Sequence, residues 1–243
     1  MRLVMWDVDA TLLRDRGRCY EAYTSAFTAH TGREFAATLA TGGRTDRWIT
    51  AEVFAQHGLD ADIPFEEFFA RYATAVAQLP PGPGPAEALP GAADVLAALH
   101  ADPGVVQTLV TGNIAPVAVA KVANVGLDRF LDTAVGGYGE HHEVRAELVR
   151  ASRARAEAAY GPFADADVLV VGDTEHDVQA ALDCDVVAVG VATGRAGAAE
   201  LAAAGAHHVL PDLRDTAAVL AVLTSPGLTA PGRPGTRSPS DRP

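Results

Sequence analysis

One short stretch near the start of the chain, RLVMWDVDAT (residues 2–11), decides the fold. Its first half is apolar from Leu3 to Trp6 and stops abruptly at Asp7, which predicts a strand buried on both faces. Strands of this kind belong to a parallel sheet that helices cover on both sides. Four further apolar runs predict strands over 105–110, 168–171, 186–191 and, more weakly, 208–210.

Alanine-rich segments with helical spacing alternate with these strands. In the first of them Val95, Leu96 and Leu99 share one face. The alternation of strand and helix predicts an α/β protein whose core is a Rossmann-like, doubly wound parallel sheet. We expect helices over 92–100, 114–125, 143–160, 176–182 and 196–204.

The first two predicted strands are separated by about 100 residues, far more than a single crossover helix needs. The intervening block carries amphipathic patterns over 19–31, 47–57 and 65–78. It therefore predicts a small α-helical cap domain inserted into the α/β core. The expected organisation is a core of 1–14 and 86–223, a cap of 15–79, a Pro/Gly linker of 80–85 and a disordered tail of 224–243.

The charge of the chain limits its partners. Its 243 residues hold 19 Lys+Arg against 31 Asp+Glu, a formal net charge of -12. A phosphate backbone or an anionic membrane favours a basic surface, so we expect neither nucleic acid nor membrane as a partner. No apolar run approaches a membrane span, and the two distant cysteines, Cys19 and Cys184, suggest no disulfide framework. We expect a cytoplasmic protein, with monomer or homodimer left open.

Polar side chains follow three of the predicted strands. Asp7 and Asp9 end the first strand, Thr111 begins the polar end of the second, and Asp173 and Asp177 follow the third. Ligands bind beyond the carboxyl ends of such strands, where these groups converge. Helix capping could explain any one of the aspartates but not all of them. Carboxylates this close repel one another unless they share a cation, and hard oxygen ligands suit Mg²⁺.

Taken in order, these motifs resemble those of the haloacid dehalogenase-like (HAD) hydrolase superfamily. They are Asp7-x-Asp9-x-Thr11, Thr111-Gly112-Asn113 and Gly172-Asp173-x-x-x-Asp177. The helical insertion is similar to the cap of that superfamily's phosphoglycolate phosphatase-like branch, and the resemblance covers all of the chain except the tail. It implies an enzyme, a Mg²⁺-dependent phosphatase that hydrolyses a small phosphate monoester through an aspartyl-phosphate.

The resemblance also implies a role for each motif residue. Asp7 is implied as the nucleophile, and Asp9 as the general acid for the leaving group and then the base for water. Thr111 is implied to bind a phosphoryl oxygen, assisted by the backbone amides of Gly112 and Asn113. The implied ligands of Mg²⁺ are Asp7, Asp9 (through its backbone carbonyl) and Asp173, whereas Asp177 is implied to act on the metal indirectly or through a water molecule.

The superfamily also uses a basic residue, usually lysine, before its last motif. The only lysine of the chain, Lys121, lies instead on the helix after Thr111, whereas Arg145 precedes Asp173 by 28 residues. We favour Arg145, because a guanidinium can bind two phosphoryl oxygens at once, and keep Lys121 as the alternative. A solvated helix arginine is the plainer interpretation of Arg145. The chain also departs from the family at Ala10, where glycine is commoner.

Within the predicted cap, the segment Gly42-Gly43-Arg44-Thr45-Asp46 stands out. It resembles the cap loop that contacts substrate in related phosphatases, which implies substrate-binding roles for Arg44, Thr45 and Asp46. A plain helix N-cap by Thr45 or Asp46 explains the same residues, and both interpretations can hold together.

Other reactions of the superfamily fit this chain less well. Dehalogenases lack the second carboxylate, which is present here as Asp9, and phosphonoacetaldehyde-type hydrolysis needs a cap lysine, which is absent. Phosphoryl transfer of the phosphoglucomutase type on the same core stays open, as does a non-catalytic binding protein of this fold. The expected partner is a small phosphorylated metabolite.

Overall fold

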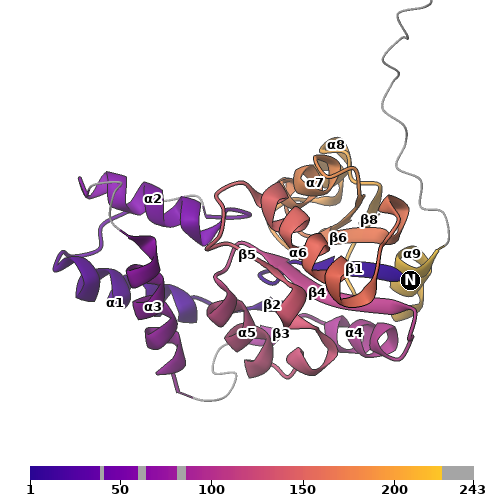
Figure 1. The fold of residues 1–243 in the computed structure, drawn as a ribbon, viewed down its shortest axis with the longest axis horizontal. Helices are drawn as coiled ribbons and strands as arrows, with labels where there is room; N and C mark the ends of the chain where they lie inside the picture. The colour runs from indigo at the N-terminus through magenta and orange to yellow at the C-terminus, as the bar shows by residue number, and fades with distance from the viewer. Residues whose placement is uncertain (39–40, 60–63, 81–85, 226–243) are drawn as a thin grey trace, which may run out of the picture.

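The computed structural model describes residues 1–38, 41–59, 64–80 and 86–225, and its centre is a parallel sheet (Figure 1). Six strands lie in the order β5-β4-β1-β6-β7-β8, so the first strand of the chain is central and the connections wind outward from it in both directions. This is the expected doubly wound arrangement. The strands are β1 (Arg2–Trp6), β4 (Val105–Thr111), β5 (Gly137–Tyr138), β6 (Val168–Gly172), β7 (Val187–Val191) and β8 (His208–Leu210).

Helices cover both faces of this sheet. Alternate residues of β1 point to opposite sides: Val4 and Trp6 pack with α4, α5 and α9, whereas Leu3 and Met5 pack with α6, α7 and α8. The continuous apolar pattern of the strands follows from this double coverage. The helices are α4 (Ala92–His100), α5 (Ala115–Asn124), α6 (Arg145–Tyr160), α7 (Glu175–Leu182), α8 (Ala198–Ala203) and α9 (Thr216–Thr224).

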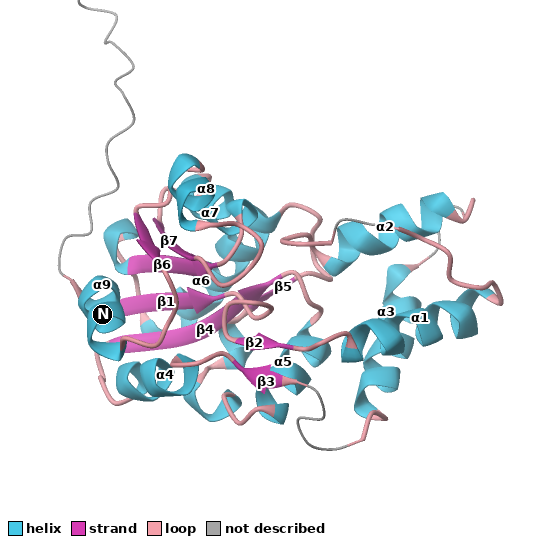
Figure 2. Ribbon diagram, turned by 180° about the vertical axis from the view of Figure 1, so that it is seen from behind, coloured by secondary structure: helices cyan, strands magenta, loops and turns pink. Residues whose placement is uncertain are grey.

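The helical insertion comprises α1 (Arg18–Thr31), α2 (Asp46–Gln56) and α3 (Phe65–Ala77). Figure 2 shows it beyond the carboxyl ends of the strands. An aromatic cluster holds its helices together, with Phe68 in contact with Tyr23 at 5.1 Å and with Phe54 at 5.5 Å between ring centroids, both edge to face. At its base, β2 (Leu13–Arg14) pairs antiparallel with β3 (Glu87–Ala88).

The last helix extends one residue into the predicted tail. Thr224 is the final residue of α9 rather than the first of the tail, because α9 packs Val219 and Leu223 onto the sheet core. The remaining tail from 226, and linker residues 81–85, lie outside the described residues.

In the described part of the chain, no helix combines the length and the apolar character that crossing a membrane requires.

The turn after β1 holds Ala10 at a φ of 61°, in the left-handed region. This explains why glycine is the commoner residue there, since a Cβ is strained in that conformation. We expect Ala10→Gly to raise the free energy of unfolding by ~0.5–1 kcal/mol, measured by thermal or denaturant unfolding. The matched change Ala70→Gly, at an exposed position of α3, should lower it by a similar amount. A loss of stability in Ala10→Gly would contradict the assignment of strain.

Candidate active site

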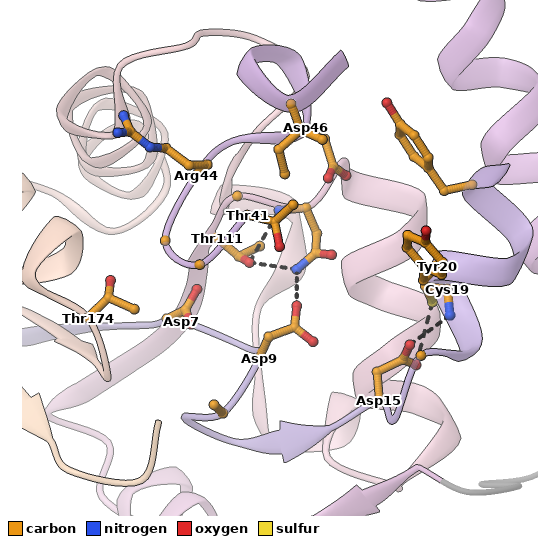
Figure 3. Close-up of a pocket in the computed structure, with 18 of the residues that line it drawn as sticks. Asp7, Asp9, Asp15, Cys19, Tyr20, Thr41, Arg44, Asp46, Thr111 and Thr174 are labelled. Carbon is orange, nitrogen blue, oxygen red and sulfur yellow. Dashed lines mark hydrogen bonds between the residues drawn. The ribbon is translucent and has the colours of Figure 1, made fainter. Parts of the chain in front are cut away.

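The polar residues that follow β1, β4 and β6 do converge at one edge of the sheet. Trp6 pairs with Leu109 of β4 and with Val171 of β6, so the three strands end at nearly the same level. Figure 3 shows Asp7, Asp9 and Thr111 facing a common space. The backbone amide of Asp7 donates to the carbonyl of Val171 at 2.9 Å, which ties the start of the loop to the neighbouring strand.

Three carboxylates form a buried cluster at this edge. One oxygen each of Asp7, Asp173 and Asp177 lies within 4.8 Å of the others. Burial raises the pKa of Asp7 to about 7 and that of Asp173 to about 8, and the neighbouring carboxylates act in the same direction on both. The Thr11 hydroxyl donates to Asp173 at 3.2 Å and lies 3.5 Å from Asp7. The cluster is therefore short of positive charge.

This donor set fits a small divalent cation. Its oxygens are hard ligands, and Oδ1 of Asp177 is buried without a hydrogen bond even though Arg145 lies close to it. The Asp9 carboxylate lies outside the cluster, so a metal role for Asp9 depends on its backbone carbonyl. The side chains of Asp7, Asp173 and Asp177, three of the four residues predicted at the metal site, thus lie together.

Arg145, the first residue of α6, projects into the cluster. Its Nη2 donates to Oδ1 of Asp7 and lies 2.6 Å from Oδ1 of Asp177, and its Nη1 donates to the carbonyl of Gly43 at 3.2 Å. The side chain is only 6 % exposed, so it is not a solvated helix arginine. The structure places Arg145, and not Lys121, against the predicted nucleophile.

Lys121 is also part of the site, but on the other side. Its Nζ donates to both carboxylate oxygens of Asp9, at 2.9 and 2.7 Å, and to Oδ1 of Asn113 at 2.8 Å. Burial alone would raise the pKa of Asp9, but Lys121 and the Asn113 amide outweigh burial and hold it below its usual value. Two buried cations therefore lie on the two sides of the Asp7–Asp9 turn.

The residues after β4 connect Asp9 to the strand. The Asn113 amide donates to Asp9 at 2.7 Å and to the hydroxyl of Thr111 at 2.9 Å. Gly112 accepts a hydrogen bond from the backbone amide of Asp46 at 2.6 Å. A Cβ at Gly112 would overlap the carbonyl oxygen of Arg44, so glycine is required for the insertion to approach this closely.

The loop that leads into α2 docks the insertion onto the core. Thr45 is the N-cap of α2, since its hydroxyl accepts from the amide of Trp48 at 3.2 Å. Oδ2 of Asp46 accepts from the amide of Ile114 at 2.9 Å. The Arg44 guanidinium lies 4.5 Å from the ring centroid of Trp48 and points away from the carboxylates (Figure 3). The capping interpretation is confirmed for Thr45, while substrate binding by this loop stays a prediction.

A cavity of about 910 Å³ separates this site from the insertion. On the side of the core it is lined by Asp7, Asp9, Asp173, Lys121 and Arg145. The opposite wall comes from the insertion and includes four aromatic side chains. Sequence patterns did not distinguish these aromatic residues, because three of them lie on helices at ordinary packing positions and Phe35 lies in the segment after α1. They are Tyr20, Tyr23, Phe35 and Tyr72.

The fold and the site define a Rossmann-like protein with an aspartate-lined site at the carboxyl ends of its strands, beneath a helical insertion. The family model of haloacid dehalogenase-like hydrolases matches residues 4–182, and the chain belongs to this family. No curated protein matches the sequence.

Solved structures share this architecture at low sequence identity. A hydrolase from Pseudomonas syringae is 22% identical with a TM-score of 0.66, covering 93% of this chain and 100% of that one. A predicted phosphatase from Clostridium acetobutylicum is 17% identical with a TM-score of 0.66, over 90% and 98%. CbbY from Rhodobacter sphaeroides, in complex with phosphate, is 16% identical with a TM-score of 0.62, over 88% and 96%. At these identities the likeness establishes the fold.

Proposed function

We propose that the protein is a Mg²⁺-dependent phosphatase that hydrolyses a small phosphate monoester through an aspartyl-phosphate on Asp7. The observation that carries this proposal is the contact of Asp7 with Arg145 inside a buried carboxylate cluster, at the floor of a cavity. A nucleophilic carboxylate beside a guanidinium can receive a phosphoryl group whose oxygens that guanidinium binds.

The first half of the reaction transfers the phosphoryl group to the protein. A carboxylate oxygen of Asp7 forms a bond to phosphorus as the bond from phosphorus to the ester oxygen breaks. The leaving alkoxide takes a proton from the protonated carboxyl form of Asp9, and Arg145 offsets the charge on the phosphoryl oxygens. Asp9 must be protonated in this step against the effect of Lys121 and Asn113, which lower its pKa. Thr111, the last residue of β4, would hydrogen-bond one of those oxygens.

The second half releases phosphate. Asp9 accepts a proton from water as the water oxygen bonds to phosphorus, and the bond between phosphorus and Asp7 breaks. Asp7, Asp173, Asp177 and the carbonyl of Asp9 would hold Mg²⁺, which when bound supplies positive charge to the phosphoryl group.

The insertion supports a small substrate and favours hydrolysis over mutase chemistry. It covers the cavity as a cap would, and a cap excludes water until substrate binds. A phosphoglucomutase-type reaction handles a second phosphate, which calls for a cation on the cap. Two arginines of the insertion line the cavity, but Arg16 pairs with Glu87 and Arg44 stacks on Trp48. We therefore favour a small metabolite with one phosphate as the substrate, with Arg14 and Arg195 as the other arginines of the core that line the cavity beside Arg145.

The test is hydrolysis of para-nitrophenyl phosphate by the full chain, with Mg²⁺ and after removal of divalent cations by EDTA. We expect turnover that requires the cation and returns when Mg²⁺ is restored. Thermal unfolding of the same samples should show stabilisation by Mg²⁺, because a ligand that binds only the folded state raises its stability. Absence of turnover together with absence of cation-dependent stabilisation would argue for the non-catalytic alternative.

A further inference from the structure

We infer that Lys121 is a positioning residue that fixes the carboxylate of Asp9 toward the leaving group of the substrate. The inference rests on the proposed function, in which Asp9 exchanges a proton with that group. It assigns a separate task to each of the two buried cations beside the Asp7–Asp9 turn. Arg145 contacts the nucleophile, whereas the Lys121 ammonium donates to Asp9 and Asn113.

The contacts form a closed triangle behind the Asp9 carboxylate. Lys121 donates to both oxygens of Asp9 and to the amide oxygen of Asn113, and the amide nitrogen of Asn113 donates back to Asp9. The Asp9 side chain stays 44 % exposed, whereas that of Lys121 is 8 % exposed. The ammonium therefore holds the carboxylate from the protein side and leaves it open to the cavity, which both residues line.

The helix that carries Lys121 is itself fixed. On α5, Ala118 and Val122 pack into the core of the sheet, and Val117 packs into the aromatic core of the insertion. The ammonium consequently has a defined place between the two halves of the molecule. A side chain that is locked in this way can orient a neighbouring catalytic group at little entropic cost when substrate binds.

The orientation of Asp9 should affect the rate most for esters whose leaving group must be protonated as it departs. Nitrophenolate departs as a stable anion and gains little from an acid, whereas phenolate without the nitro group gains more. Phenyl phosphate and para-nitrophenyl phosphate share the same ring and the same phosphate, so they form a matched pair. The ratio kcat/KM reports the first phosphoryl transfer, in which the leaving group departs.

The experiment measures kcat/KM for both esters in the wild type, Lys121→Met, Asp9→Asn and the double variant. We expect Lys121→Met to lose about tenfold more activity with phenyl phosphate than with para-nitrophenyl phosphate. The double variant should be no worse than Asp9→Asn, because Lys121 acts through Asp9. Lys121→Gln, which keeps a hydrogen-bond donor, should lie between the wild type and Lys121→Met. The control is Arg153→Met, which breaks ion pairs with Glu157 and Asp165 far along α6 and should change neither ester's hydrolysis.

The inference would be overturned if Lys121→Met lowered kcat/KM equally for the two esters. It would also be overturned if the double variant lost more activity than Asp9→Asn alone, since either result would show a structural role for Lys121. If Lys121→Met does not fold, the same comparison is made with Lys121→Gln. A wild type that hydrolyses neither ester contradicts the proposed function, and the inference falls with it. That outcome is distinguished from the others because it appears before any variant is compared.

Discussion

Replacing Asp7 by asparagine is expected to lower kcat for phosphate monoester hydrolysis on the order of 10⁴-fold or more, the scale seen when a nucleophile is removed. The asparagine amide has nearly the same shape but cannot form the bond to phosphorus. The fold should survive, because Asp7 is one of three buried carboxylates whose mutual repulsion the change relieves. Turnover and thermal unfolding are measured on the same preparation.

The control for this variant is Asp94→Asn, which alters an exposed carboxylate in the first turn of α4 and should leave kcat unchanged. Acid quenching during turnover should trap a phosphorylated wild-type chain, detected by its intact mass, and no such species in Asp7→Asn. If Asp7→Asn kept about a tenth of the wild-type kcat, or still accumulated a phosphorylated chain, Asp7 would not be the nucleophile.

The sheet and the carboxylate cluster were accessible from the sequence because both depend on local pattern. A strand that is covered on both faces must be apolar throughout, as Leu3 to Trp6 are, and residues after such strands must meet at one edge. The strands that the sequence did not reveal, β2, β3 and β5, have two residues each. A strand of two residues is too short to show an alternating pattern. Its pairing depends on the flanking segments that bring it next to its neighbour.

The partners of the two cations could not be obtained in the same way. The sequence placed Lys121 on the helix after the second predicted strand and Arg145 on the helix before the third, but the residue that each one contacts depends on where those helices pack. The close approach of the insertion to the loop after β4 could not be predicted from the sequence either. It needs glycine at position 112, where the carbonyl of Arg44 leaves no space for a side chain. Glycine is common in polar loops for conformational reasons alone, so its presence there did not indicate a contact with the insertion.

Replacing Arg145 by methionine is expected to lower kcat/KM by about 10²–10³-fold, the usual cost of removing one charged donor from a transition-state site. The guanidinium contacts Asp7 and Asp177 and is the cation that we propose binds the phosphoryl oxygens. Its loss leaves two buried carboxylates without their partner, so the free energy of unfolding at neutral pH should also fall. Mg²⁺ should recover part of that stability, since it offsets the same charges.

Arg145→Lys separates charge from geometry, because lysine is the usual residue at this point of the family's site. It should restore most of the activity that Arg145→Met loses, although an ammonium cannot bridge Asp7, Asp177 and the carbonyl of Gly43 at once. Arg150→Met, which removes an exposed arginine from the same helix, should have no effect on kcat/KM. If Lys121→Met lowered kcat/KM for para-nitrophenyl phosphate more than Arg145→Met does, Lys121 rather than Arg145 would be the cation that acts on the phosphoryl group. That ester hardly needs the proton from Asp9, so its hydrolysis reports on the cation that faces the phosphoryl group.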